Sequence, residues 1–413
     1  MSTPARNQLI LVLAAAVLGL LFAGISTHDY VAHLDRQLHD VHCSIIPGLG
    51  ATGEGASGCR VAMNSAYSAL FRGAFWGGIP IALFALGLYV FFSAFAVGLL
   101  AAREEADRRL YDLLAAASFG PLAATIVMAL ISAVKLGSFC KTCIGLYVAS
   151  ILLCLGAVWA ALRVRRAAAG GPAHLVAPGG DPLRRGGAGP ILGWVGLGAL
   201  CLIVPVVCYV AALPDYRPRL TSCGTLPAAK DGTARSLLKL QTPRATRPAT
   251  VFVDPLCPTC KALHQRLDDE GVIENLDLSV ALFPLDSSCN WMVDRSLHPG
   301  ACLLSRAVVC AEGREREALD WVYRNQDELT RLGKAGDAPL RARVREHFGG
   351  GVDACLDAKK TKVRMNNLLQ YAVANRVPVS TPQLYLGERR VCDEDTDLGL
   401  RYTLSQLAPE VLR

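Results

Sequence analysis

The chain has 413 residues, of which 52% are hydrophobic and only 19% are charged, and its mean hydropathy is positive. These values exclude a purely soluble globule. The net charge of +7 does not indicate nucleic-acid binding, because the Lys and Arg residues are dispersed and several clusters flank apolar stretches, as in membrane proteins. Fifteen cysteines are too many for a reduced cytosolic chain without metal sites, so some of them should face an oxidising compartment.

Five apolar stretches in the first half of the chain are long enough to cross a hydrocarbon core, which takes roughly 20 helical residues. The first stretch is short enough to be a secretory signal, but no clean cleavage site follows it, and we expect a retained helix. The five predicted spans are Leu9–Ile25, Ala74–Ala101, Leu113–Leu136, Phe139–Leu162 and Ile191–Leu213.

Basic residues between the spans set the expected orientation, because short cytoplasmic loops collect Lys and Arg. Arginines are concentrated between the second and third spans and again between the fourth and fifth, so both loops should be cytoplasmic. Residues 28–73, the turn near Gly137 and everything after Leu213 are then expected on the outer side. Lys135 and Lys141 oppose the rule, but near a helix end both side chains can extend to the interface.

The pattern changes in the second half of the chain. The stretch AAAGGPAHLVAPGGDPLRRGGAGP is rich in Gly, Pro and Ala without a helical or strand period, and we expect a linker there. From about Thr250, short apolar runs alternate with amphipathic ones, which is typical of an α/β domain. ATVFVDP and LDLSVALFPL are predicted strands with the helix PTCKALHQRLDDEG between them, and several helical stretches precede the strand TPQLYLG.

Two cysteines open the predicted helix that follows ATVFVDP. A helix amino terminus favours a thiolate on Cys257, because its unpaired backbone N–H groups and the macrodipole stabilise negative charge. Cys257 should then be the attacking sulfur and Cys260 the resolving one. The alternatives are a structural disulfide and half of a zinc site. Closed zinc sites commonly use a second C-x-x-C or a His pair, and His264, Cys289 and His298 lack that spacing.

The second half of the chain resembles the thioredoxin superfamily, in its variant with an inserted helical subdomain. The resemblance rests on the order of its elements, which is a strand, a C-x-x-C at a helix start, a strand, a helical region and STPQL before another strand. The resemblance covers roughly residues 245–413. It implies that Pro382 is a cis proline beside the active site, and proline is nearly the only residue that hosts a cis bond. It also implies that the backbone at Thr381 can bind an extended substrate.

The other cysteines of the second half suggest structural roles. Cys289 and Cys302 are near enough in sequence to close a small loop, and a structural disulfide is the favoured reading. Cys310 and Cys355 lie on helix-like segments, where they either bridge two helices or are buried apolar residues. Connectivity cannot be deduced from sequence, so the pairing of these cysteines with Cys223 and Cys392 stays open. Packing roles are expected for the remaining cysteines of the apolar spans, Cys154, Cys201 and Cys208.

Four cysteines of the first half form two more pairs. Cys43 and Cys59 lie in the outer loop after the first span, and the glycine-rich segment between them allows the two thiols to meet and to move. Cys140 and Cys143 open the fourth span in FCKTCIGLY, at the expected bilayer edge. Because disulfides exchange with dithiols through thiolate attack, a series of paired cysteines forms a two-electron relay. A quinone is the natural membrane-soluble end of such a relay.

The first half of the chain resembles the vitamin K epoxide reductase family, specifically its bacterial members fused to a thioredoxin-like domain. The resemblance rests on four features: a loop cysteine pair, a Ser soon after it, a Gly-x-Pro entering the second helix and a C-x-x-C opening the fourth. The match covers about residues 8–163, and the loop between the first two cysteines is longer than in many relatives. The resemblance implies that Cys43 and Cys59 are a shuttle pair and that Cys140 and Cys143 are the active-site pair. It also implies that the hydroxyls of Ser65 and Tyr147 lie near the quinone.

Each of these residues is assigned a role. Cys143, deeper in the helix, should pass electrons to the quinone, and Cys140 should exchange with the loop pair. Lys141 and the helix amino terminus can stabilise the thiolate, while Ser65 and Tyr147 can donate hydrogen bonds to the ring carbonyls. Without the resemblance, Ser65 would be interpreted as an N-terminal helix cap and Tyr147 as an aromatic residue at the membrane interface.

The expected architecture is an all-α four-helix membrane bundle, a fifth transmembrane helix, and an α/β thioredoxin-like domain with a helical insertion. The expected divisions are residues 1–165 for the bundle, 166–190 for a cytoplasmic linker, 191–213 for the fifth helix and 214–413 for the outer domain.

The expected function is quinone-dependent thiol–disulfide oxidation in the bacterial inner membrane, with disulfides made in reduced periplasmic proteins. Electrons would pass from the CPTC pair to the loop pair, then to the membrane C-x-x-C and finally to ubiquinone or menaquinone, without a metal or nucleic acid. Outward flow, with the outer domain acting as a reductase or isomerase, is the alternative. A membrane-anchored binding module with structural disulfides would leave the C-x-x-C of the fourth span unexplained.

Overall fold

The computed structural model describes residues 5–36, 58–102, 108–137, 139–169, 189–229, 236–240, 245 and 247–412. The chain forms two compact units. The first contains Met1–Leu70 and Ile79–Leu213, and the second contains Phe71–Gly78 and Pro214–Arg413. The predicted linker lies largely outside the described residues, although α5 continues to Ala169 and α6 begins at Gly189.

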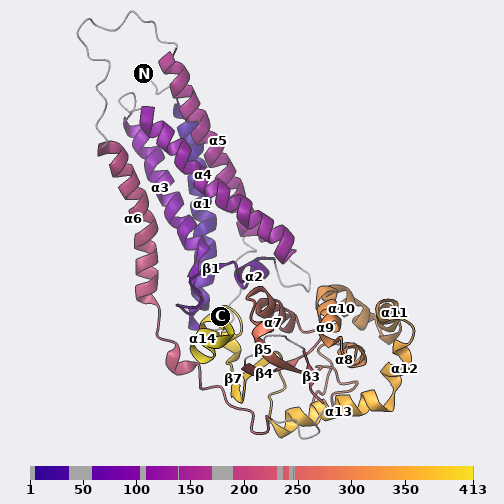
Figure 1. The fold of residues 1–413 in the computed structure, drawn as a ribbon. Helices are drawn as coiled ribbons and strands as arrows, with labels where there is room; N and C mark the ends of the chain where they lie inside the picture. The colour runs from indigo at the N-terminus through magenta and orange to yellow at the C-terminus, as the bar shows by residue number, and fades with distance from the viewer. Residues whose placement is uncertain are drawn as a thin grey trace, which may run out of the picture. The chain divides into compact units, whose positions relative to one another are not determined.

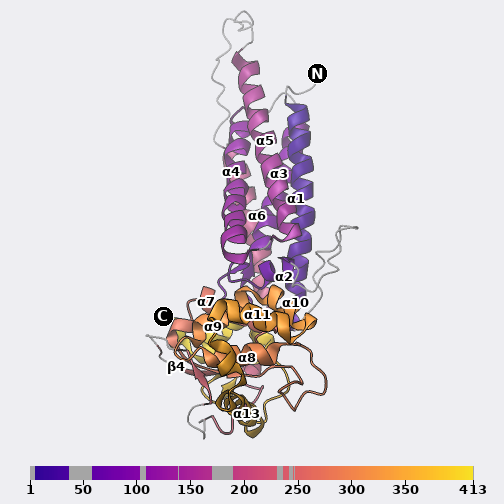
Figure 2. The ribbon, with the colours of Figure 1, turned by 90° about the vertical axis from the view of Figure 1, so that its right-hand side faces the viewer.

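Long apolar helices make up the first unit (Figure 1). In the described part of the chain, five helices are long and apolar enough to cross a membrane, as the sequence predicts. In Figure 2 they run alongside one another as a bundle. They are α1 (Arg6–Ala32), α3 (Ile81–Ala102), α4 (Arg108–Ile131), which continues as a π-helical turn at Ser132–Leu136, α5 (Lys141–Ala169) and α6 (Gly189–Ala212).

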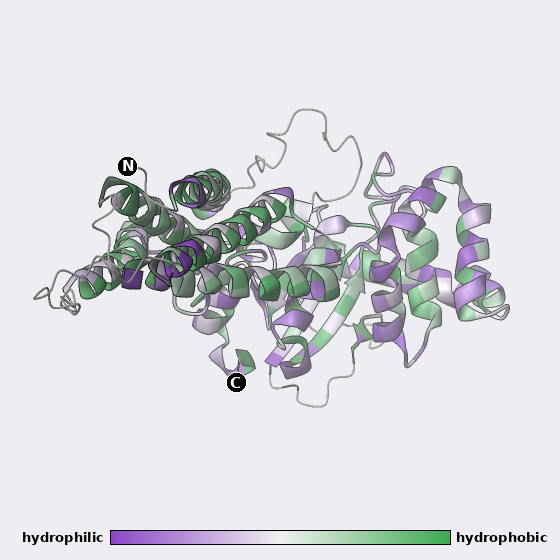
Figure 3. Cartoon of the chain, turned by 90° about the horizontal axis from the view of Figure 1, so that it is seen from above, coloured by the Kyte–Doolittle hydropathy of each residue, from purple (hydrophilic) through white to green (hydrophobic). Residues whose placement is uncertain are grey.

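The bundle buries one apolar core and leaves other apolar side chains on its outer faces. Helix α1 packs against α3 and α5, α4 packs against α5, and α6 packs against α3. Phe92 and Leu114 belong to the buried core, whereas Leu21, Leu130 and Leu155 are each about 60% exposed. Figure 3 shows the helices of this unit as largely hydrophobic. Helices that are apolar on every face are typical of membrane spans.

Short elements of the first unit lie between α1 and α3 in the described residues. They are a 3-10 turn at His33–Asp35, α2 (Gly58–Met63) and the antiparallel strands β1 (Ala69–Leu70) and β2 (Ile79–Pro80). The predicted start of the second span at Ala74 is therefore wrong, because α3 begins only at Ile81. Gly77 and Gly78 have positive φ, which interrupts a helix, and Pro80 is well suited to stand at the entry of one.

A five-stranded sheet organises the second unit. The order is β3-β5-β4-β6-β7, with β4 and β5 parallel and the other neighbours antiparallel. Helix α7 (Pro258–Asp269) connects the two parallel strands. This is the thioredoxin-like arrangement that the sequence predicts, although the two-residue edge strands were not expected. The strands are β3 (Leu238–Lys239), β4 (Arg247–Val253), β5 (Leu276–Leu282), β6 (Gln383–Leu386) and β7 (Arg389–Arg390).

A helical insertion separates β5 from β6, and one helix follows β7 (Figure 1). The insertion packs its apolar faces into the same core as the sheet, through residues such as Leu304, Val322 and Leu368. Its helices mix polar and apolar residues (Figure 3), as expected of a water-exposed subdomain. They are α8 (Ala301–Cys310), α9 (Glu315–Arg324), α10 (Gln326–Ala335), α11 (Asp337–Phe348), α12 (Val352–Asp357) and α13 (Lys359–Ala374), and the last helix is α14 (Leu400–Leu407).

Disulfides hold this second unit at three places. Cys289 and Cys302 form a bond, which is the pair expected from their spacing. Cys310 is bonded to Cys355, so this pair bridges α8 and α12. The third bond joins Cys223 to Cys392 across 169 residues. Together they confirm that several cysteines of this unit are structural, and they are typical of an oxidising compartment.

Candidate redox-active sites

Cys257 lies at the amino terminus of α7, in the second unit. It is the residue that caps the helix, with Pro258 at the first helical position. The Thr259 hydroxyl is 2.9 Å from the Cys257 sulfur. The same sulfur lies 3.5 Å from the carbonyl oxygen of Thr381, and the peptide bond from Thr381 to Pro382 is cis, as the resemblance implies. The CPTC motif, the helix start and the cis proline therefore form one site.

The two thiols of this motif are chemically unequal. Hydrogen bonding from the Cys260 thiol, assisted by the Thr259 hydroxyl, lowers the pKa of Cys257 to about 6 despite burial. Burial raises the pKa of Cys260 well above its ordinary value, and its side chain is fully buried. Cys257 is therefore the more acidic thiol of the pair and Cys260 the less acidic one, which is the inequality that an attacking and a resolving thiol need.

A buried carboxylate holds the loop before Cys257. The carboxylate of Asp254 accepts hydrogen bonds from the backbone N–H groups of Leu256 and Leu285, each at 2.6 Å. The Asp254 backbone N–H donates to the Cys260 sulfur at 3.4 Å. His298 lies 2.8 Å from the same carboxylate through its Nδ1. Burial lowers the pKa of His298, but hydrogen bonding to Asp254 outweighs this effect and the pKa is raised.

The helical insertion also contacts the site. Gln326, at the start of α10, is buried and donates through Nε2 to the backbone carbonyls of Pro255 and Cys257, both at 3.0 Å. His298, which contacts Asp254, belongs to the small loop that the Cys289–Cys302 disulfide closes. Sequence reasoning missed the roles of Asp254, Gln326 and Thr259 and considered His298 only as a metal ligand.

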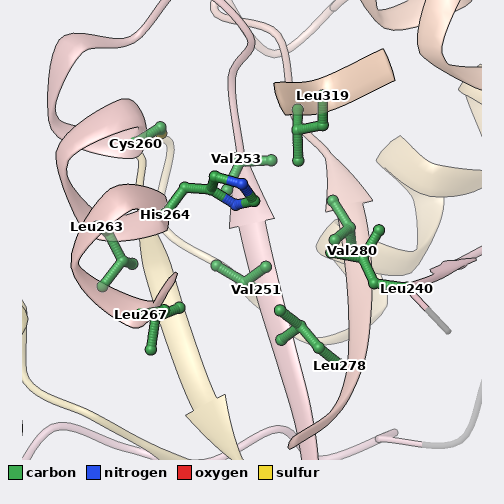
Figure 4. A pocket seen from close by; sticks show the side chains of 10 residues that line it. All are labelled: Leu240, Val251, Val253, Cys260, Leu263, His264, Leu267, Leu278, Val280 and Leu319. Atoms are coloured by element: carbon green, nitrogen blue, oxygen red, sulfur yellow. The ribbon is translucent and has the colours of Figure 1, made fainter. Parts of the chain in front are cut away.

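A small apolar cavity lies directly behind Cys260, between α7 and the strands (Figure 4). It is lined mostly by aliphatic side chains such as Val251, Leu263 and Val280. His264 reaches across it and bonds Asp320 through Nε2 at 2.6 Å. This apolar backing keeps water from Cys260 and is consistent with its protonated state.

The first unit carries the second pair of thiols. Cys140 lies one residue before α5, and Cys143 is in the first turn of that helix. The Cys140 sulfur is 3.0 Å from the Cys59 sulfur on α2 and 2.9 Å from the Thr142 hydroxyl. Both Cys140 and Cys143 are free thiols, whereas Cys59 is disulfide-bonded. The structure thus brings together three of the predicted cysteines, and the fourth, Cys43, lies outside the described residues.

The close approach of α2 to the start of α5 depends on a glycine. A Cβ atom at Gly58 would lie 2.4 Å from the carbonyl oxygen of Phe139, so glycine is needed for the close approach of Cys59 to Cys140. Cys140 is buried, and hydrogen bonding from the Cys143 thiol lowers the pKa of Cys140 to about 6. Cys140 therefore has the character of an exchanging thiolate.

The two predicted quinone-binding hydroxyls have different surroundings. Tyr147 is one helical turn beyond Cys143 on α5, and its hydroxyl lies 3.4 Å from the Ser132 hydroxyl on the π-helical turn. Ser65 follows α2, donates to the Ala62 carbonyl at 2.7 Å and accepts from the backbone N–H of Tyr67. The Ser65 hydroxyl thus closes a turn after a helix rather than capping the start of one. Ser132 was not anticipated from the sequence.

Metal ligation has little support in the described residues. Possible ligand atoms gather at Cys223, Cys392 and Glu394. The two cysteines are bonded to each other, so neither is available as a thiolate.

Comparisons with known proteins complete the description of these sites. Residues 10–158 match the model of the Vitamin K epoxide reductase family, and comparison with curated proteins finds no match. Among solved structures, the oxidoreductase DsbA from Xylella fastidiosa is similar at 20% identity with a TM-score of 0.31, over 42% of this chain and 94% of that one. A linker-deletion mutant of ScsC from Proteus mirabilis is similar at 14% identity with a TM-score of 0.26, over 55% of this chain and 98% of that one.

The family match covers one of the two thiol sites. The family match contains Cys59, Cys140 and Cys143, whereas the CPTC site lies on the thioredoxin-like sheet of the second unit. Residues 10–158 of the chain are thus similar to the vitamin K epoxide reductase family, and the sheet of the second unit has a thioredoxin-like strand order.

Proposed function

We propose that the protein is a quinone-dependent thiol–disulfide oxidoreductase that makes disulfide bonds in secreted proteins. The observation that carries this proposal is the 3.0 Å separation between the Cys140 and Cys59 sulfurs. Thiol–disulfide exchange needs one sulfur to approach another closely, and here a sulfur of the outer segment meets the thiol at the start of a membrane helix.

The first exchange takes place at the CPTC site. A disulfide between Cys257 and Cys260 is attacked by a thiolate of the reduced client, which forms a mixed disulfide with Cys257 and leaves Cys260 as a thiol. The second client thiolate then attacks the client sulfur, so the client gains a disulfide and both CPTC residues become thiols. The thiolate of Cys257 next attacks the disulfide of the loop pair, and Cys260 resolves the product.

The second exchange takes place at the membrane thiols. The reduced loop pair attacks the disulfide between Cys140 and Cys143 through Cys59, whose sulfur lies 3.0 Å from that of Cys140. The partner thiol of the loop pair then attacks Cys59, which releases Cys140. The loop disulfide is restored, and Cys140 and Cys143 hold the two electrons as thiols. The contact serves both directions of exchange, because each step is reversible.

The donor set beyond Cys143 fits a quinone. The Tyr147 hydroxyl lies one helical turn from Cys143, and the Ser132 hydroxyl of the π-helical turn lies 3.4 Å from it. Two neighbouring hydroxyls suit one carbonyl oxygen of a flat, lipid-soluble ring. A bound quinone would accept the two electrons and two protons of the dithiol. In this proposal Tyr147 and Ser132 orient the ring at one carbonyl, and Ser65 stays a proposed residue of the quinone site.

The proposed location is the bacterial inner membrane, with the loop cysteines and the thioredoxin-like unit in the periplasm. Arginine-rich connections support this orientation through the positive-inside rule. The three disulfides of the second unit support it independently, because such bonds persist on the oxidising side. Reduced periplasmic proteins and the quinone pool would be the partners.

Quinone reduction driven by a reduced client tests this proposal. The purified protein is supplied with a reduced, unfolded disulfide protein and a quinone, and the quinone absorbance and the client thiols are followed together. We expect one quinone to be reduced for every two client thiols lost, which is one quinone for each client disulfide formed. Cys140→Ser should abolish quinone reduction, because the membrane pair can no longer form a disulfide. Cys208→Ser, which removes an exposed free thiol of α6, should leave the rate unchanged.

The order of the relay is tested with trapped intermediates. Cys260→Ser removes the resolving thiol, so we expect a mixed disulfide that joins Cys257 to Cys43 or Cys59, identified by peptide mass spectrometry. Client thiols lost without quinone reduction would contradict the proposal. Quinol-driven reduction of client disulfides at a higher rate than oxidation would favour outward flow and a reductase or isomerase.

A further inference from the structure

The segment Phe71–Gly78, with the sequence FRGAFWGG, belongs to the second unit although the membrane-unit elements β1 and β2 flank it on both sides. More than 130 residues of membrane unit and linker separate it in sequence from Pro214, where the rest of the second unit begins. Its contacts with Glu270 after α7, with α14 and with the loop before α14 are therefore long-range tertiary contacts. They are specific enough to indicate a docking function.

Trp76 is the central residue of this segment. Its side chain is only 2% exposed, and its Nε1–H donates to the Oδ1 atom of buried Asp395 at 2.7 Å. Its ring packs on Tyr216 with centroids 4.9 Å apart. A Cβ atom at Gly399 would lie 2.2 Å from Trp76 Nε1, so the glycine leaves the space that the indole occupies. A buried tryptophan with its N–H satisfied is the typical anchor of a protein interface.

Arg72 adds a second, independent contact. It is 5% exposed and forms an ion pair with buried Glu270, which also pairs with Arg401 of α14 at 2.5 Å. Glu270 directly follows α7, the helix that Cys257 caps at its other end. Ser405 of α14 donates to the Gly73 carbonyl at 2.8 Å. Because a buried ion pair is stable only when both partners are present, this pair makes docking specific.

We propose that Phe71–Gly78 is a docking segment that fastens the thioredoxin-like unit to the membrane domain at a second point, in addition to the covalent connection after α6. Cys59 is on the same connection of the membrane domain, 12 residues before Phe71. A docked unit keeps Cys257 at a higher effective concentration near the loop cysteines than one tether alone does. This consequence for turnover rests on the proposed function, whereas the docking itself does not.

Retention after cleavage tests the docking directly. A site-specific protease sequence is inserted between Leu213 and Pro214 of the full chain, and membranes are cleaved and separated from the supernatant. The chain also carries Cys257→Ser, so that no mixed disulfide of Cys257 can hold the fragment. We expect the cleaved fragment to stay with the membranes. Trp76→Ala and, separately, Arg72→Ala should each raise the released fraction at least about tenfold, the effect of losing about 1.4 kcal/mol at an interface anchor.

The matched control is Phe71→Ala, because Phe71 belongs to the same segment but is 66% exposed; it should leave retention unchanged. Release of the fragment from the chain with an intact segment would overturn the proposal. Retention in both the Trp76→Ala and the Arg72→Ala chains would overturn it as well. Neither outcome involves quinone or client, so failure of the docking is distinguishable from failure of the redox function.

Discussion

Cys140 and Cys257 share one local arrangement in two unrelated folds. Each lies immediately before a helix, and each has a threonine two residues later whose hydroxyl lies 2.9 Å from the cysteine sulfur. The pKa of each is lowered to about 6. Since a thiolate is stabilised by hydrogen-bond donors and by a helix amino terminus, Thr142 and Thr259 belong to the redox sites.

Thr259→Val should therefore make Cys257 less acidic. A hydrogen bond to a charged group is worth about 1.5–3 kcal/mol, so its loss should raise the pKa of Cys257 by about one to two pH units. Alkylation needs the thiolate, so its rate rises through the pKa and the whole profile should move to higher pH. The measurement is the iodoacetamide reaction rate of the Cys257 peptide as a function of pH, read by mass spectrometry.

Thr259→Ser is the matched control, because it keeps the hydroxyl and removes only a methyl group. Its pH profile should superimpose on that of the unaltered protein. A Thr259→Val profile that also superimposes would show that the hydroxyl does not stabilise the thiolate.

At the scale of elements, the helical insertion supports the CPTC site from outside the sheet. Gln326 of α10 holds the two carbonyls before α7, and the Cys289–Cys302 loop presents His298 to Asp254. The insertion is in turn held by the Cys310–Cys355 bond between α8 and α12. The site is thus positioned by an element whose stability depends on a disulfide remote from the thiols that react.

Removing that remote disulfide should weaken the domain without altering the chemistry of Cys257. For a loop of 45 residues, the chain-entropy model gives about 4 kcal/mol of stabilisation. The double substitution Cys310→Ala and Cys355→Ala should therefore lower the melting temperature of the thioredoxin-like unit in calorimetry of the purified protein. Cys208→Ala serves as the control and should melt as the unaltered protein does. An unchanged transition in the double variant would contradict the structural role.

At the scale of the whole molecule, the chain combines a membrane bundle with a disulfide-rich unit. The positions of the basic residues predict on which side of the membrane each connection and the second unit lie. Arginines cluster between α3 and α4 and around the linker. Five crossings by the candidate spans would place the segments before α1 and after α6 on opposite sides of the membrane. In the proposed orientation the outer side receives both the loop cysteines and the CPTC site, as the proposed relay requires.

Reporter fusions test this orientation. Alkaline phosphatase is active only after export, so a fusion after Arg413 should be active and a fusion within residues 170–188 should be inactive. A fluorescent protein that folds only in the cytoplasm should give the opposite pattern at the same two positions. Phosphatase activity from the linker fusion would refute the predicted sidedness.

Much of the fold could be predicted from the sequence, because its signals are local. Apolar length marks a membrane helix, and CPTC after a buried strand marks a helix start. Residues 74–78 were misassigned to a membrane span because their apolar composition suits lipid and a protein interior equally, and only tertiary packing separates the two. Gln326 and Asp254 were missed for a related reason, since Gln326 and the carbonyl of Cys257 are 69 residues apart and no spacing rule links them.

The shared acidity of Cys140 and Cys257 has a consequence for control of the pathway. In exchange chemistry the more acidic thiol is the better leaving group, and two cysteines with a pKa of about 6 give neither pair that advantage. Thiol acidity at these two positions therefore favours neither direction of transfer between the two sites. In the proposed function, the direction of net transfer would be set by the ratio of reduced client to oxidised quinone.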